Sequence, residues 1–111
     1  MDEAIRAKYQ ARADVLKSLA HPTRLFIVDE LSRREMCVRD ITRMVGADMS
    51  TVSRHLSVLR NAGVVGADRR GSQVYYSLKA RCVTNFFGCV EGVLKSSAAE
   101  QAAFASKTFV K

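Results

Sequence analysis

The chain has 111 residues, which is enough for one domain with a single hydrophobic core and too few for two. Hydrophobic residues make up 48% of it and proline occurs once, a composition that indicates a compact globular protein and excludes a disordered one. The formal net charge of +7 favours a polyanionic partner over an acidic one.

The positive charge is concentrated in the middle of the sequence. Residues 1–40 hold eight Lys/Arg against seven Asp/Glu, and residues 82–111 hold three against two. Residues 41–81 hold seven against two, so five of the seven net charges lie there. This local excess predicts a nucleic-acid partner, although a generally basic, soluble surface is the simpler alternative.

Nothing in the sequence indicates export or membrane insertion. Asp2 and Glu3 open the chain where a secretory signal would carry a basic and then an apolar run. No apolar stretch reaches the roughly 18 to 20 residues that span a bilayer. We therefore expect a cytoplasmic protein with no membrane partner, whose three cysteines stay reduced.

The first third of the chain predicts two helices with a break between them. Residues 2–20 contain good helix formers and few large apolar residues, so the first half of this helix is expected on the surface or against a second copy. Pro22 favours the first turn of a new helix, which should run to about Arg33. We expect His21 at this break to pack or to cap a helix. The second helix is expected to bury Leu25, Ile27, Val28 and Leu31.

The next elements predict a helix-turn-helix. A short helix that begins at Asp40 or a neighbour should end at Gly46, because glycine tolerates the left-handed conformation found at helix ends. It is expected to contain Ile41, Met44 and Val45. After a tight turn, Asp48 can cap a second helix from Ser50 to Asn61. In such a motif the second helix lies in the DNA groove with its N-terminal residues toward the bases.

The helix from Ser50 to Asn61 has an apolar face and a polar face. Val52, Leu56 and Leu59 recur at helical spacing, so we expect them to face the core. The opposite face carries hydroxyls, a guanidinium and an imidazole, which can hydrogen-bond base edges or phosphates. The predicted DNA-binding residues of this helix are Ser50, Thr51, Ser53, Arg54 and His55.

Residues 64–78 predict a β-hairpin with β-prone runs at 64–68 and 73–78 and a turn at Arg69-Arg70-Gly71-Ser72. Val74, Tyr76 and Leu78 alternate toward one face, and Tyr75 points toward the other. Two adjacent arginines at an exposed tip bind phosphate well, so Arg69 and Arg70 are also predicted DNA-binding residues. The alternative is that they serve solubility. A hairpin that follows a helix-turn-helix is the wing of a winged helix.

Residues 80–97 predict a last helix whose apolar band is wider than one core contact requires. Helices of this kind in small domains commonly bury that face in a partner. The band consists of Val83, Phe86, Phe87, Val90, Val93 and Leu94. The alanine-rich residues 98–111, with Phe104, Phe109 and Val110 as potential anchors, leave open a short extra helix or a flexible tail. Residues 1–111 are thus predicted to form a single winged helix-turn-helix domain.

Four strings in this order resemble the ArsR-type (ArsR/SmtB) winged-helix metalloregulators. They are LAHPTRL at 19–25, EMCVRDI at 35–41, STVSRHLSVLRNAGVV at 50–65 and RGSQVYYSL at 70–78. The resemblance covers about residues 15–97 and implies a mainly α fold with a small β-hairpin wing, dimerising through its first and last helices. It also implies a homodimeric repressor, not an enzyme, that binds an inverted repeat in double-stranded DNA and lets go when an effector binds.

The resemblance makes Cys37, Cys82 and Cys89 the predicted metal- or effector-binding residues. In arsenic- and cadmium-sensing members the string around Cys37 usually reads CVC, whereas here Arg39 replaces the second thiol. The positions that hold zinc in other members correspond here to Ala80, Cys82, Val93 and Ser96, so that zinc site is largely lost. The predicted inducer is arsenite or another soft metal ion, with no constitutive cofactor.

Cys82 and Cys89 share a helix face but are separated by roughly 10 Å along its axis. Metal–sulfur bonds of about 2.3 Å do not span that gap unless the first turn is not helical or a second protomer contributes. Arg81 and the helix N-terminus favour the thiolate of Cys82. Cys89 could instead fill apolar space between Phe86 and Val90, as free cysteines often do.

Three alternative functions stay open beside a metal-responsive repressor. The same repressor could sense peroxide or persulfide through thiol oxidation. A winged-helix module that binds protein without recognising DNA is a second alternative, although the basic residues Arg54, Arg60, Arg69 and Arg70 argue against it. A thiol enzyme is disfavoured because no histidine with a supporting carboxylate is evident beside a cysteine.

Overall fold

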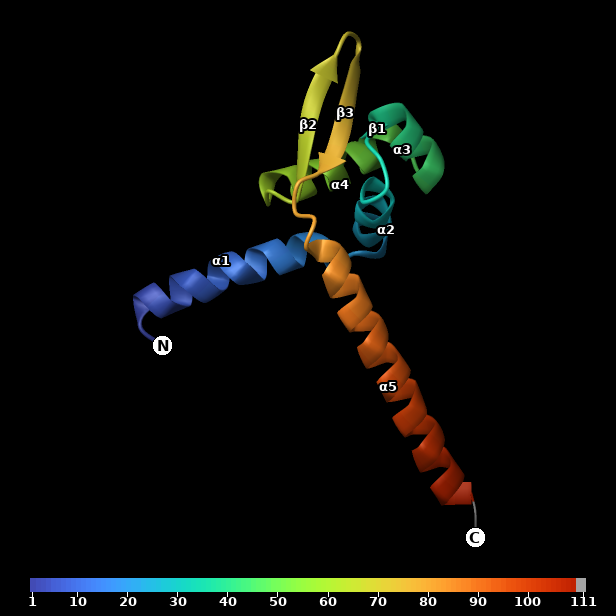
Figure 1. Cartoon of the computed structure of the whole chain (residues 1–111). Helices are drawn as coiled ribbons and strands as arrows, with labels where there is room; N and C mark the ends of the chain where they lie inside the picture. The colour runs from blue at the N-terminus through green and yellow to red at the C-terminus, as the bar shows by residue number, and fades with distance from the viewer. Residues whose placement is uncertain (110–111) are drawn as a thin grey trace. The chain divides into compact units, whose positions relative to one another are not determined.

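The computed structural model describes residues 1–109, and the side chains of residues 1–105. By its internal contacts the chain divides into two compact units, Met1–Arg81 and Cys82–Lys111, each of which is described by itself. In chain order the elements are α1 (Glu3–Leu19), α2 (Pro22–Leu31), β1 (Met36–Cys37), α3 (Val38–Val45), α4 (Met49–Asn61), β2 (Val65–Arg70), β3 (Gln73–Leu78) and α5 (Val83–Phe109) (Figure 1). The predicted mainly helical fold with a small β wing is confirmed. Within residues 1–109, none of the helices is long and apolar enough to cross a membrane.

The break between α1 and α2 is made by a histidine cap. The ring Nδ1 of His21 accepts a hydrogen bond from the backbone N–H of Thr23 at 3.1 Å, and Pro22 occupies the first helical position. The predicted capping role of His21 is therefore confirmed.

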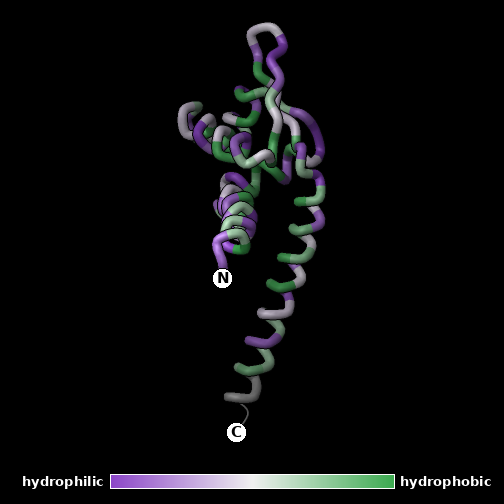
Figure 2. The backbone as a smooth tube through the Cα atoms, turned by 90° about the vertical axis from the view of Figure 1, so that its left-hand side faces the viewer, coloured by the Kyte–Doolittle hydropathy of each residue, from purple (hydrophilic) through white to green (hydrophobic). Residues whose placement is uncertain are grey.

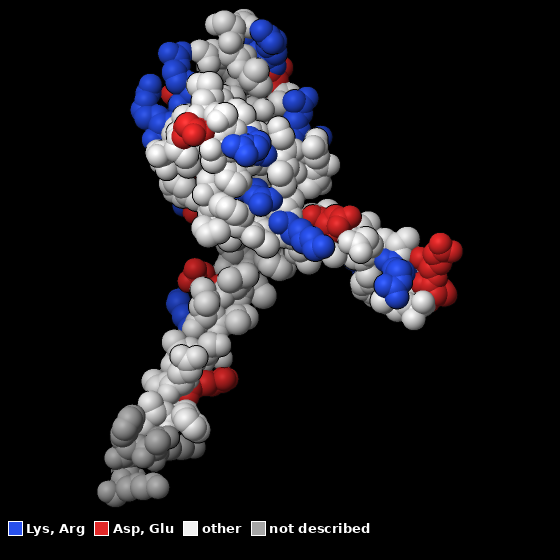
Figure 3. Space-filling model, turned by 180° about the vertical axis from the view of Figure 1, so that it is seen from behind, with Lys and Arg blue, Asp and Glu red and all other residues white. Residues whose placement is uncertain are grey.

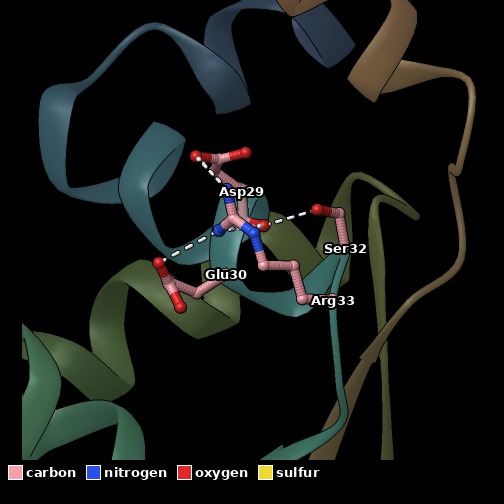
Figure 4. Close-up of polar contacts among 4 residues, drawn as sticks. All are labelled: Asp29, Glu30, Ser32 and Arg33. Atoms are coloured by element: carbon pink, nitrogen blue, oxygen red, sulfur yellow. Dashed lines mark hydrogen bonds and ion pairs between the residues drawn. The ribbon is translucent and has the colours of Figure 1, made fainter.

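Helix α2 ends at Leu31, earlier than expected, in a cluster of short-range polar contacts. The guanidinium of Arg33 lies 3.5 Å from the Asp29 carboxylate and 3.1 Å from that of Glu30, and the Ser32 hydroxyl donates to the Asp29 carbonyl (Figure 4). Of these contacts, the Ser32 hydrogen bond reaches a backbone carbonyl in the last turn of the helix, and the two ion pairs join side chains.

The expectation that α2 buries Leu25 is wrong, because 38% of this side chain is exposed. Ile27, Val28 and Leu31 are buried as expected. At 3.6 residues per turn, Leu25 lies more than a quarter turn from the face that these three share.

The helix-turn-helix consists of α3 and α4, joined by the turn at Gly46. Gly46 ends α3 with a φ of 77°, which confirms its predicted role. Helix α3 begins at Val38, two residues before Asp40, and Ile41 is its fully buried residue. Helix α4 packs on α1, α2, α3 and β2, so the core of this unit fixes the second helix of the motif.

The wing is part of a three-stranded antiparallel sheet in the order β1-β3-β2. The two-residue strand β1 was not predicted; Met36 pairs with Tyr76 and Cys37 with Tyr75. The predicted turn was too long, since β2 continues through Arg70 and the chain reverses at Gly71 and Ser72, where Gly71 has a φ of 64°. A glycine at positive φ allows this two-residue connection. The arginines thus lie on the strand, next to the tip.

Helix α5 forms the second unit. It begins at Val83, because residues 81 and 82 form a turn, and it continues through Phe109. Residues 98–109 therefore extend α5, while Val110 lies outside the described residues. Hydrophobic residues recur along the part of the helix that is coloured in Figure 2, and Phe86, Val90, Val93, Leu94 and Phe104 are exposed in the single chain.

Candidate DNA-binding surface

Helix α4 is fixed by a cap at its start and by three buried residues on its inner face. The Asp48 carboxylate accepts hydrogen bonds from the Thr51 backbone N–H at 2.7 Å and from the Ser50 hydroxyl at 2.9 Å. Hydrogen bonding from Thr51, by its side chain and its backbone, and from Ser50 lowers the pKa of Asp48 below its ordinary value. The fully buried residues are Val52, Leu56 and Leu59, as the helical spacing predicted.

The outer face of α4 offers short polar groups around one exposed guanidinium. Ser50 and Arg54 are exposed, and Thr51 and Ser53 are half-buried at the edges of the face. Because Ser50 already donates its hydroxyl proton to Asp48, its oxygen is left as an acceptor toward a ligand. The four side chains lie in the N-terminal half of the helix, the part that meets base edges in a helix-turn-helix.

His55 differs from the other predicted DNA-binding residues of α4 because it is half-buried against another side chain. Its ring centroid lies 4.5 Å from that of His21, with the ring planes tilted by 47°. Burial, followed by electrostatic interaction with His21, Arg24 and Arg54, lowers the pKa of His55. His55 therefore joins α4 to the start of α2, a contact that sequence patterns did not predict.

Arg69 and Arg70 point to opposite faces of the wing, because successive strand residues alternate. Arg69 is exposed and pairs in register with Val74. Arg70 is engaged within the protein: its guanidinium lies 2.9 Å from the Glu35 carboxylate, 3.0 Å from that of Asp68, and 4.8 Å from the centroid of the Tyr75 ring. The alternation of side chains along a strand could have predicted the ion pair of Arg70 with Asp68, two residues away. It could not have predicted the ion pair with Glu35, which lies 35 residues earlier and is brought close by the sheet.

Basic side chains are widely distributed on the first unit. Figure 3 shows Lys and Arg spread over one face of it, including the wing and its neighbouring flank. Residues 41–81 hold seven Lys/Arg against two Asp/Glu; five of the seven lie in α3, α4 and the wing, and Lys79 and Arg81 follow β3. Such a field attracts the phosphate backbone of DNA.

The three cysteines are free thiols in different settings. Cys37 is buried at the start of α3 in the first unit, whereas Cys82 and Cys89 are exposed in the second. Cys82 lies in the turn before α5, so about six helical residues, or about 9 Å, separate it from Cys89 along the axis. Among the described residues, no group of three or more His, Cys, Asp or Glu side chains is placed to hold a metal ion.

A capped helix with a polar outer face, a preceding helix joined to it by a glycine turn, and a basic hairpin together define a winged helix-turn-helix of the DNA-binding class. A model of the arsR family of bacterial regulatory proteins matches residues 21–66. Together with the relatives described next, this match shows that the chain belongs to the arsR family and is a transcriptional regulator, not an enzyme.

The relatives match most of the chain. The transcriptional regulator Rv0081 of Mycobacterium tuberculosis is 37% identical over 87 residues, which cover 78% of this chain and 76% of the relative. Its crystal structure has a TM-score of 0.74 at 34% identity and covers 85% of this chain and 95% of Rv0081. The transcriptional repressor SmtB homolog of Synechocystis is 36% identical over 88 residues, 79% of this chain and 67% of the relative.

A third similar protein is described as a homodimer. The solution structure of the homodimeric winged helix-turn-helix DNA-binding domain Mb0332 from Mycobacterium bovis has a TM-score of 0.75 at 30% identity. The match covers 90% of this chain and 93% of that domain.

Proposed function

We propose that this regulator is a homodimeric repressor that binds an inverted-repeat operator through α4 and the wing. The observation that carries the proposal is the two-sided character of α4. Three fully buried residues fix its inner face, while Ser50 and Arg54 stand exposed in the half of the helix that would enter a major groove. Arg69 of the wing and the basic residues of α3 would hold the phosphate backbone on either side.

Dimerisation is supported by the apolar side chains that a single chain leaves in water. Ile5, Tyr9 and Leu16 of α1 are 44%, 53% and 50% exposed, and the apolar row along α5 is exposed as well. Burial of both rows against a second copy would remove this surface from water. A symmetric pair would present two α4 helices to successive major grooves, one helical turn or about 34 to 36 Å apart.

The effector is proposed to act through thiols, with arsenite or another thiophilic ion as inducer. Cys82 and Cys89 are exposed and therefore accessible. Their separation of about 9 Å along one helix does not suit a single ion with metal–sulfur bonds of about 2.3 Å. An ion would therefore bind thiols from both protomers. Cys37, buried in the first unit, is proposed to affect the response through α3, which it precedes.

Thiol oxidation by peroxide or persulfide is the second proposed mode of release. It is supported by the exposure of Cys82 and Cys89, because oxidation needs an accessible thiol and no coordination shell. Arsenite under reducing conditions would release DNA in the first mode, whereas an oxidant would do so reversibly, with recovery by reductant, in the second. A Cys82→Ser variant that responds normally to both reagents would contradict both modes.

DNA binding itself is tested by fluorescence anisotropy on DNA from the promoter of the protein's own gene, against a scrambled duplex of the same length. We expect tighter binding to the promoter, and we expect Ser50→Ala and Arg54→Ala to reduce the difference between the two duplexes by about 1 to 3 kcal/mol for each lost base contact. Equal binding of both duplexes by the wild type would contradict operator recognition. No binding to either would favour a protein-interaction module.

A further inference from the structure

A cluster of charged and aromatic side chains covers the outer face of the wing. Asp68 and Arg70 project from β2 on the same face as Tyr75 of β3, because Asp68 pairs with Tyr75 and Arg70 with Gln73 in the antiparallel register. Glu35 joins them from the residue directly before β1. The cluster therefore joins β2 and β3 to the segment that leads into β1.

The Arg70 guanidinium is directed away from the tip of the wing. Both of its contacts within the hairpin, Asp68 and Tyr75, lie two positions farther from the Gly71 turn than Arg70 and its register partner Gln73. Its third contact, Glu35, lies outside the hairpin. Arg70 thus uses its forked guanidinium to join two carboxylates over an aromatic ring.

We propose that Arg70 is a positioning residue that fastens the wing to the segment leading into β1 and α3, and that Arg69 is the wing arginine that contacts phosphate. This inference rests on the proposed function as a DNA-binding regulator. One guanidinium between two carboxylates gives the cluster a net charge of −1, which repels a phosphate. Arg69, on the other face, is exposed and has no such pair of carboxylates around it in the described contacts.

The cluster also determines how the wing is held relative to the helix-turn-helix. Strand β1 is two residues long, and the next residue already begins α3. A contact from Arg70 to Glu35 therefore connects the end of β2 to the approach of α3. Exposed ion pairs are individually weak. Their effect is expected on the placement of the wing, and therefore on DNA affinity, more than on global stability.

The salt dependence of promoter binding separates a positioning arginine from one that binds phosphate. Each lost phosphate contact reduces the slope of log affinity against log salt by about 0.9. A dimer carries two wings, so Arg69→Ala should flatten the slope by about 1.8. Arg70→Ala should leave the slope unchanged and weaken binding by up to about tenfold, the range expected from loss of exposed ion pairs.

Two further variants give opposite results under the two roles of Arg70. Glu35→Gln removes one carboxylate partner of Arg70. If Arg70 positions the wing, the affinity for promoter DNA should fall while its salt dependence stays unchanged. If Arg70 binds phosphate, the substitution would free its guanidinium and the affinity would rise. Arg70→Lys keeps the charge but loses the fork, so it should behave like Arg70→Ala and not like the wild type. Circular dichroism melting confirms that each variant is folded.

The outcomes separate this inference from the proposed function. A wild-type protein that does not bind the promoter overturns the proposed function, and this inference with it. If the wild type binds the promoter, either of two results overturns the inference alone. One is a salt slope for Arg70→Ala that is as flat as that for Arg69→Ala, and the other is tighter promoter binding by Glu35→Gln than by the wild type. Tighter binding by Glu35→Gln would then assign Arg70 to phosphate contact.

Discussion

Leu56→Ala should strongly destabilise the winged helix, because Leu56 belongs to the fully buried inner face of α4. Helix α4 packs on α2, α3 and β2, so the space left by the missing side chain would adjoin several elements that cannot all move inward. Leucine-to-alanine changes at such sites cost about 2 to 5 kcal/mol. Full burial on a helix that packs against several elements places Leu56 in the upper half of that range.

Val58→Ala is the matched control, since it removes an aliphatic side chain from the same helix at a position that is 40% exposed. We expect it to cost less than about 1 kcal/mol, because surface substitutions leave no cavity. Urea unfolding at one fixed protomer concentration measures both variants, since the stability of a dimer depends on concentration. Equal costs for the two variants would refute the assigned orientation of α4.

Three further predictions follow from caps, protonation and the apolar row of α5. Asp48→Asn should lower the stability of α4 at neutral pH, because the ionised carboxylate is the stronger hydrogen-bond acceptor. Folding lowers the pKa of Asp48, so the stability advantage of the wild type should disappear when the pH falls well below about 4. Folding also lowers the pKa of His55, so the folded protein binds a proton at this imidazole less readily than the unfolded chain does. The free energy of unfolding should therefore decline as the pH falls below about 6.5, and in urea unfolding His55→Gln should show a weaker decline. Leu94→Ser should shift the protein toward monomer in light scattering at low micromolar concentration, whereas Lys95→Ser should not; a fully dimeric Leu94→Ser would remove α5 from the proposed interface.

The helix-turn-helix could be predicted from the sequence because its determinants are local. Val52, Leu56 and Leu59 recur within a few turns of one helix, Asp48 caps its own helix, and Gly46 ends the helix before it. In each of these cases the residues that determine the structure lie within about a dozen positions of one another. Periodicity and capping preferences describe such ranges well.

The contacts that sequence patterns could not have predicted join residues that are far apart in the sequence. The ring contact of His55 with His21 depends on how α4 packs against the start of α2. Strand β1 has only two residues, so it shows no alternation and exists because β3 is beside it. Without that strand, Glu35 could not be identified as a partner of Arg70. For a similar reason the polar face predicted for α4 included His55, which is half-buried in the structure.

The position of Cys82 restricts how a thiol effector could release DNA. Because Cys82 precedes α5 and Cys89 follows about two turns into it, neither a bound ion nor a disulfide can join them in one chain without unwinding the first turns of α5. Bridges between protomers avoid that cost and would act directly on the dimer. In a symmetric repressor the separation of the two α4 helices must match the groove spacing of the operator. An effector that changes the pairing of α5 helices would therefore weaken DNA binding without touching α4. A mixed dimer with Cys82→Ser in one protomer and Cys89→Ser in the other keeps one bridge between Cys82 and Cys89 of different protomers, so it should still release DNA, whereas a dimer with Cys89→Ser in both protomers should not.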